Sequence, residues 1–96
     1  MSNYFIAYIK IHHPEEYERY LEGFDEVFEK FKGKIIVVDN RPTVLEGEWP
    51  YTRVVVIRFP SEEELKHWYE SPEYRSLVQH RWEASEADII VVKGRE

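Results

Sequence analysis

Cysteine is absent from this chain of 96 residues. A disulfide framework, a thiolate metal site and a cysteine nucleophile are therefore excluded. The sequence also has no phosphate loop, no dinucleotide fingerprint and no Ser-His-Asp order. Its longest apolar runs are too short to span a bilayer, and no basic leader precedes the first strand-like segment. We therefore expect a cytoplasmic protein.

Basic residues are in the minority, with 13 Lys and Arg against 19 Asp and Glu and a net charge of -6. Nucleic-acid binding relies on Lys and Arg contacts to phosphate, so nucleic acid is not an expected partner. An anionic membrane surface is disfavoured for the same reason.

Aromatic residues are plentiful, at 16% of the chain, with three Trp, seven Tyr and five Phe. A chain of this length forms one domain, which we assign to residues 1–96. Such a small domain buries a modest share of its surface. Some of the aromatic side chains are therefore expected in an interface or a pocket.

The first half of the chain predicts a strand, a helix and a second strand. Residues 4–11 are rich in β-branched and aromatic side chains, which predicts a strand. The alternation of a strand places Phe5, Ala7, Ile9 and Ile11 on one face and Tyr4, Ile6, Tyr8 and Lys10 on the other, and both faces are largely apolar. Pro14 predicts the start of a helix, and Gly33 predicts its C-cap. Apolar residues between them recur at helical spacing: Tyr17, Tyr20, Leu21, Phe24, Val27, Phe28 and Phe31. Residues 34–39 predict the second strand.

The second half predicts a hairpin strand, two helical pieces and a last strand. Residues 40–42 predict a bulge or bend because Pro42 cannot donate to a ladder. Extended structure is expected at 43–46, a turn at 47–50 and a strand at 52–59. Ser61 with Glu64 predicts a capping box, and Ser71-Pro72 predicts a break followed by a new helix with Ser71 as its cap. Residues 88–93 predict the last strand.

The resulting order is β-α-β-β-α(α)-β, which an α+β fold satisfies with a four-stranded antiparallel sheet and helices on one face. This is the ferredoxin-like βαββαβ arrangement. The opposite sheet face also carries Tyr, Ile and Val side chains, and the helices cannot cover it. The same face of a second copy is the simplest cover, so we expect a face-to-face homodimer.

Several motifs resemble the DUF1330 family, within the dimeric α+β barrel superfamily, over nearly the whole chain. They are Pro14-Glu15-x-Tyr17, Phe31-x-Gly33-x-Ile35, Val44-Leu45-Glu46-Gly47-Glu48-Trp49, Arg53-Val54-Val55-Val56-Ile57-x-Phe59-Pro60-Ser61, and Trp68-Tyr69-x-Ser71-Pro72-x-Tyr74 with Arg81 seven residues on. The resemblance implies a ferredoxin-like monomer and a dimeric α+β barrel. It implies little about chemistry, although the wider superfamily includes monooxygenases and haem-degrading enzymes.

Two positions depart from the family pattern. Members usually have an acidic N-cap where this chain has His13, and a glycine pair where this chain has Asn40-Arg41. If those glycines let a ligand approach the backbone, the departure puts a ligand role for that edge in doubt.

The histidines predict no metal site. His12 and His13 are adjacent on an extended segment and point to opposite faces, while His67 and His80 lie on different helical pieces. No His pair has the spacing of a helical metal motif. No metal and no cofactor are therefore expected.

Arg81 and Glu46 are the candidate catalytic residues. Arg81 shares a helical face with apolar residues and must find an acceptor. The acceptor is either a carboxylate such as Glu46 or Glu70, a helix end, or an anionic ligand. Glu46 either pairs with Arg53 across the hairpin or acts as a buried general base.

Arg41, Trp68, Tyr69 and Tyr74 complete the candidate ligand-binding set with Arg81. Arg41 sits at the predicted bend, where it is either a ligand contact or an exposed loop residue. The three aromatic residues either pack in the core and interface or form a pocket wall with polar tips.

Three functions are consistent with these observations. The first is binding of a small apolar or carboxylate-bearing molecule between sheet and helices, with cofactor-independent oxygenase-like or isomerase-like chemistry. The second is a non-catalytic homodimer with a packed interior. The third is a ligand-sensing module. A cavity beside Arg81 would favour the first function over the second.

Overall fold

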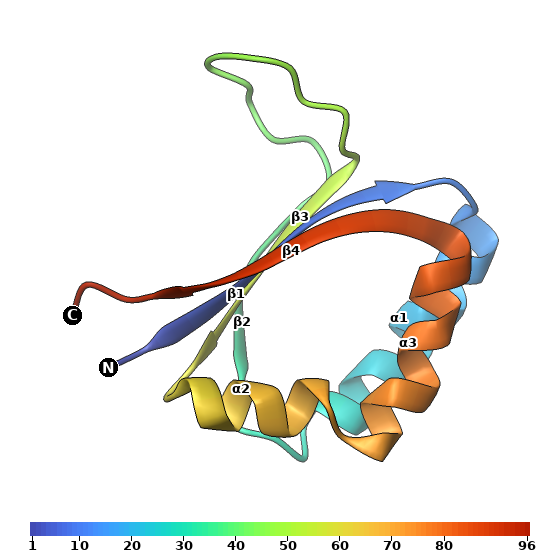
Figure 1. Cartoon of the computed structure of the whole chain (residues 1–96). Helices are drawn as coiled ribbons and strands as arrows, with labels where there is room; N and C mark the ends of the chain where they lie inside the picture. Colours follow the sequence, from blue (N-terminus) through green and yellow to red (C-terminus); the bar gives the residue numbers. More distant parts are fainter.

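The computed structural model describes residues 1–96 and has the order of elements expected from the sequence. The elements are β1 (Asn3–Ile11), α1 (Pro14–Phe28), β2 (Lys34–Asp39), β3 (Arg53–Phe59), α2 (Glu62–Tyr69), α3 (Pro72–Ala84) and β4 (Ser85–Lys93). The strands form one antiparallel sheet in the order β2-β3-β1-β4. The helices lie on one side of it (Figure 1). The α+β ferredoxin-like βαββαβ prediction is confirmed. None of the three helices combines the length and apolar character needed to cross a membrane.

The pairing register separates the two faces of the sheet. Phe5, Ala7 and Ile9 of β1 are buried beneath the helices, and the residues between them are less buried. Phe5 pairs with Ile57 and Ala7 with Val55, so these β3 residues also face the helices. The alternation predicted for β1 is therefore confirmed.

A β-bulge interrupts β2 near Ile36, where the register shifts between Ile35 and Val37. Because of this extra residue, Ile35 and Val38 both pair with helix-facing residues of β3. The bulge or bend predicted at residues 40–42 is present as a bend at Asn40 and Arg41, whereas the bulge near Ile36 was not predicted.

Residues 40–52 form a long loop that projects away from the sheet (Figure 1). The extended segment predicted at 43–46 is not a strand, so this prediction was wrong. Leu45 in this loop is 89% exposed. The hairpin of β2 and β3 is confirmed but is shorter than predicted, because pairing stops at Asp39 and Val54.

Helix α1 ends at Phe28, before the predicted cap at Gly33. The chain must turn there to return to β2. A Cβ atom at Gly33 would lie 2.6 Å from ring carbons of Phe28 and Phe59, so the backbone passes tightly under these rings. Strand β4 begins at Ser85, earlier than predicted, because Ser85 pairs with Ile11.

Trp68 is fully buried at the centre of the core. Its indole contacts rings from several elements, with centroid distances of 5.2 Å to Phe5, 5.4 Å to Phe59, 5.6 Å to Phe28 and 4.4 Å to Tyr74. Truncating such a residue to Ala typically costs about 3–5 kcal/mol. This cluster therefore joins α1, α2 and α3 to the sheet.

The two chain ends lie side by side. Asn3 of β1 pairs with Lys93 of β4, and the Gly94 amide donates to the Ser2 carbonyl at 2.7 Å. Both ends emerge at the same end of the sheet (Figure 1).

Both predicted serine caps are confirmed. The Ser61 hydroxyl accepts from the Glu64 amide, and the Ser71 hydroxyl accepts from the Tyr74 amide. Ser71 is also buried and donates to the Trp68 carbonyl at 2.8 Å. It therefore links the end of α2 to the start of α3.

Ser71→Ala is expected to lower the free energy of unfolding by about 1–2 kcal/mol, because it removes both the cap and the bond to Trp68. Ser76→Ala, at an exposed position inside α3, should change it by no more than about 0.5 kcal/mol. Urea unfolding of the two variants measures the difference. Equal stabilities would show that Ser71 does not hold the junction.

Candidate functional site

A cavity of about 250 Å³ lies between the helix-facing side of the sheet and α1. Most of its wall is apolar: Ala7, Ile9, Leu21, Phe24, Val38 and Val55 belong to it. The small side chain of Ala7, between the larger Phe5 and Ile9, leaves room at the middle of β1. The bulge in β2 brings both Ile35 and Val38 to the same wall.

Arg81 of α3 lines this cavity and is 4% exposed. It is buried because it shares one face of the helix with Tyr74 and Val78, at spacings of seven and three. No carboxylate forms a salt bridge with it, and its Nη2 atom is buried without a hydrogen-bond partner. A buried cation without a counter-ion is unfavourable, so the position is suited to receive an anion.

The tyrosines beside Arg81 stay protonated at neutral pH. The hydroxyls of Tyr20 and Tyr74 are 2.6 Å apart in the core. Burial raises the pKa of Tyr20 well above its usual value and raises the pKa values of Tyr17 and Tyr74 as well. For Arg81, burial disfavours the charged form, but the nearby Tyr74 and Tyr20 outweigh it and leave the pKa raised. The guanidinium is therefore charged, and the tyrosine hydroxyls can donate hydrogen bonds.

A second arginine, Arg53, also lines the cavity. Its Nη1 donates to Asn40 Oδ1 at 2.9 Å, its Cζ lies 5.6 Å from the centre of the Tyr17 ring, and its Nε is buried without a partner. From the sequence, Arg53 was predicted only as a possible partner of Glu46. Its place in the strand could have revealed it, because Arg53 has the same parity as the helix-facing Val55 and Ile57.

Three predicted ligand-binding aromatics lie outside the cavity wall. Trp68 and Tyr74 are fully buried in the core. Tyr69 packs under Arg75, whose Nε and Nη2 donate to the Tyr69 carbonyl at 2.9 Å and 2.6 Å. Trp68 and Tyr74 pack behind the cavity wall, and the Tyr74 hydroxyl is hydrogen-bonded to the hydroxyl of the lining residue Tyr20.

Glu46 and Arg41 lie in the exposed loop and do not line the cavity. Glu46 forms no ion pair with Arg53. Asp25 is the one carboxylate that lines the cavity, and its side chain is exposed. Arg81 is thus the only predicted site residue at the cavity wall, where it is joined by Arg53 and two tyrosines.

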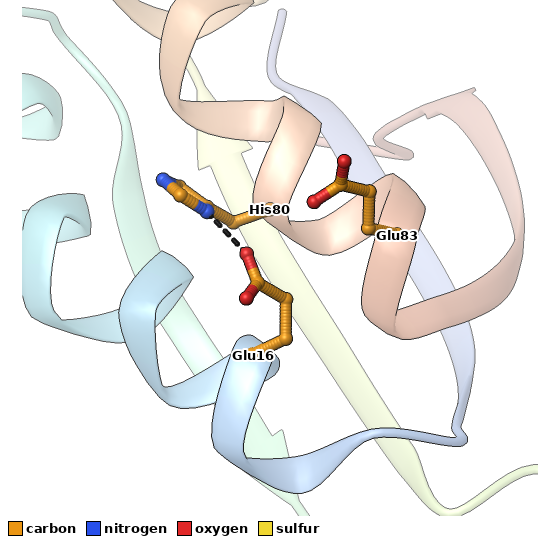
Figure 2. Close-up of side chains that lie close together, drawn as sticks. All are labelled: Glu16, His80 and Glu83. Carbon is orange, nitrogen blue, oxygen red and sulfur yellow. Dashed lines mark hydrogen bonds and ion pairs between the residues drawn. The ribbon is translucent and has the colours of Figure 1, made fainter.

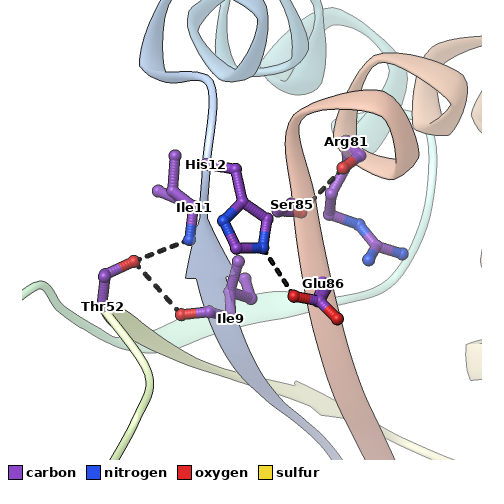
Figure 3. A network of polar contacts seen from close by, with 7 residues as sticks. All are labelled: Ile9, Ile11, His12, Thr52, Arg81, Ser85 and Glu86. Carbon is purple, nitrogen blue, oxygen red and sulfur yellow. Dashed lines mark hydrogen bonds and ion pairs between the residues drawn. The ribbon is translucent and has the colours of Figure 1, made fainter.

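Histidines contribute nothing to the cavity wall. His80 bonds to Glu16 near Glu83, between α3 and α1 (Figure 2). His12 bonds to Glu86 at 2.6 Å (Figure 3).

Backbone and hydroxyl contacts fix the end of α3 that carries Arg81. Ser85 donates to the Arg81 carbonyl at 2.7 Å, and the amides of His12 and His13 donate to the Ala84 carbonyl. Thr52 bridges the Ile9 carbonyl and the Ile11 amide on the other side of this corner (Figure 3). The position of Arg81 is therefore set by the junction of β1, β4 and α3.

The arrangement offers positive charge and hydroxyl donors within an apolar space. It can bind an anionic oxygen or stabilise negative charge that develops on one.

Comparison with known proteins identifies a family but no activity. The family model "Domain of unknown function (DUF1330)" matches residues 2–95. No curated protein sequence matches the chain significantly.

Three solved structures illustrate the fold. A protein of unknown function from Rhodopseudomonas palustris is 20% identical with a TM-score of 0.82, covering 99% of this chain and 83% of its own. A dimeric ferredoxin-like protein of unknown function from Jannaschia sp. CCS1 is 9% identical with a TM-score of 0.79, covering 98% and 100%. SnoaB, a cofactor-independent oxygenase from Streptomyces nogalater, is 10% identical with a TM-score of 0.73, covering 99% and 94%. At these identities the similarity establishes the fold.

Raising the pH above about 10 is expected to destabilise the protein partly through Tyr20. The unfolded side chain ionises near its usual pKa of 10.0, whereas the folded one keeps its proton because its pKa is raised. The unfolded state then binds fewer protons, so the unfolding free energy falls as pH rises. Tyr20→Phe should make this fall shallower by up to about 1.4 kcal/mol per pH unit, the value for one proton. Urea unfolding from pH 8 to 11 tests this, and parallel slopes would contradict it.

Proposed function

The chain belongs to the DUF1330 family, whose function is undefined, and we propose that it binds a small, mainly apolar molecule carrying an anionic oxygen in the cavity beside Arg81. The observation that carries this proposal is the buried guanidinium of Arg81, which has no salt-bridge partner and a free Nη2 atom. A ligand carboxylate, phenolate or enolate would supply the missing acceptor.

The size and lining of the cavity narrow the ligand. An apolar cavity of about 150 Å³ holds benzene, so 250 Å³ suits a single substituted ring or a short branched chain. The apolar wall would bind the body of the molecule. Arg81 and the hydroxyls of Tyr17 and Tyr20 would orient its oxygen, and Arg53 offers a second donor.

Any chemistry at this site would be stabilisation of negative charge on the ligand oxygen. Arg81 is the proposed catalytic residue, acting as an electrostatic stabiliser of an enolate-like anion. The tyrosines would donate hydrogen bonds and not act as bases at neutral pH, since their pKa values are raised. Cofactor-independent oxygenase-like or isomerase-like reactions both pass through such anions, and SnoaB is an oxygenase on the same fold. Glu46, exposed in the loop, has no role in this proposal.

The chain is also proposed to form a face-to-face homodimer. The sheet face turned away from the helices carries Ile6, Tyr8, Val37, Val54, Val56, Ile90 and Val92. Ile90 is 48% exposed, and an apolar area of this kind usually marks an interface. Related structures from Jannaschia sp. CCS1 and Thermobifida fusca are described as dimeric. Nucleic acid and membranes are not part of the proposal, and the cytoplasmic location stays a prediction.

A non-catalytic homodimer is the competing function. It shares the proposed dimer face but gives the cavity no ligand. The unpartnered Arg81 beside an apolar void favours ligand binding, because a purely structural interior would gain stability by pairing or replacing this cation.

Benzoate is expected to bind saturably, and benzyl alcohol, of similar size without the charge, to bind at least about tenfold more weakly, since truncating a buried charge pair costs about 2–5 kcal/mol. Chemical shifts of backbone amides measure both affinities. Arg81→Gln should abolish the preference for benzoate, whereas Arg95→Gln, on the exposed tail, should keep it. Equal binding of the two compounds to the unmodified protein would refute the anion site.

Native mass spectrometry is expected to give twice the chain mass of 11.7 kDa at micromolar concentration. Ile90→Glu should yield monomers, because it places a charge on the apolar sheet face. Trp82→Glu introduces the same charge at a 51% exposed position on α3 and should leave the dimer intact. A monomeric unmodified protein, or a dimer insensitive to Ile90→Glu, would exclude this interface.

A further inference from the structure

A second polar cluster lies at the seam of α1 and α3, outside the cavity wall (Figure 2). It consists of Glu16, His80 and Glu83, and we call it the seam cluster. One nitrogen or oxygen atom from each side chain lies within 4.8 Å of the others. The side chains come from two helices, and Figure 2 shows the Glu16 carboxylate directed at the His80 ring, with Glu83 projecting from the same helix as His80.

The local structure explains this convergence. His80 and Glu83 are three residues apart on α3, so they share one face of the helix. Glu16 lies in the first turn of α1, which Pro14 starts. The His80 Nδ1 and Glu16 Oε2 atoms are 2.5 Å apart, so the two helices already meet at this point.

We propose that the seam cluster binds a divalent transition-metal ion, with Zn²⁺ or Co²⁺ as the best match. One imidazole and two carboxylates form a mixed ligand set that suits Zn²⁺, Co²⁺ or Ni²⁺ better than Mg²⁺ or Ca²⁺, which prefer oxygen ligands alone. Three protein ligands leave at least one position for water, as in open zinc sites.

The charges around the cluster favour a cation. The Glu83 side chain forms no hydrogen bond or ion pair, and its carboxylate lies close to that of Glu16. Besides His80, the basic groups near Glu16 are Arg19, whose Nη1 lies 3.6 Å from the other carboxylate oxygen, and His13. Two neighbouring carboxylates repel each other, and a bound metal ion would remove this repulsion.

The other histidines give internal controls. His12 pairs with Glu86 and His67 with Glu64, but neither pair has a third ligand within reach. The seam cluster differs from these pairs by the second carboxylate. Histidine spacing along the sequence could not reveal this cluster, because Glu16 and His80 are 64 positions apart.

A metal ion here would join the two helices that carry the cavity residues. Tyr17 follows Glu16 directly, and Arg81 follows His80 directly. The ion would therefore stiffen the seam next to the anion site, and the melting temperature should rise with metal concentration.

Titration of the full chain with Co²⁺ tests the site, because bound Co²⁺ has a visible absorption spectrum that reports its ligands. One ion per chain is expected. His80→Ala and Glu83→Gln each remove a proposed ligand of the ion. Each should weaken binding by more than about tenfold, because the loss of even an outer-shell partner costs at least about tenfold. His67→Ala should leave both the affinity and the spectrum unchanged.

Co²⁺ binding by the Glu83→Gln and His67→Ala variants decides whether the site exists. Glu83 is exposed, so Glu83→Gln should fold even if His80→Ala does not. Loss of the spectrum in Glu83→Gln with retention in His67→Ala supports the site. Absence of Co²⁺ binding by the unmodified protein, or binding that survives Glu83→Gln unchanged, overturns it.

Discussion

The rings packed around Trp68 hold the helical layer to the sheet, and the rest of the structure depends on this contact. The indole contacts β1 through Phe5, β3 through Phe59, α1 through Phe28 and α3 through Tyr74. These large side chains fill the space between the layers around α2. Farther along β1, Ala7 faces the helices, and α1 packs against α3 instead of closing onto the sheet. The cavity is the space that this uneven packing leaves.

The dense packing of aromatic rings around Trp68 also determines where buried polar groups can lie. Tyr20 and Tyr74 share one hydrogen bond between their hydroxyls, and the Nη2 atom of Arg81 beside them has no hydrogen-bond partner. Replacing the ion by an apolar residue would be the simpler way to build a core. A buried guanidinium at a cavity wall, with no salt bridge and an unpaired Nη2 atom, therefore supports the proposed ligand more than it supports packing alone, and Arg53 adds a buried, unpaired Nε atom from the sheet.

The elements that local chemistry specifies could be predicted from the sequence. The serine caps, Pro14, and the alternation in β1 all gave correct starts and faces. The errors arose where distant segments decide the outcome. The pattern of α1 continues to Phe31, but the chain leaves the helix at Phe28 to pass Gly33 under the rings. Ser85 looks like a loop residue until it pairs with Ile11. For the site, Arg81 could be predicted because it lies on an apolar helical face. The cavity could not be predicted, because it depends on how closely the helices pack against the sheet, and no local sequence pattern encodes this.

The meeting of the chain ends has a consequence for how the polypeptide closes on itself. Asn3 lies opposite Lys93, and the Gly94 amide donates to the Ser2 carbonyl, so the two ends of the chain are adjacent. The long loop at residues 40–52 projects from the other end of the sheet. A short linker between the ends and a break in that loop would preserve every strand pair and every helix. Such a circular permutant would begin beside β3 and end beside β2, and the order in which the strands emerge from the ribosome would change while the folded contacts would not.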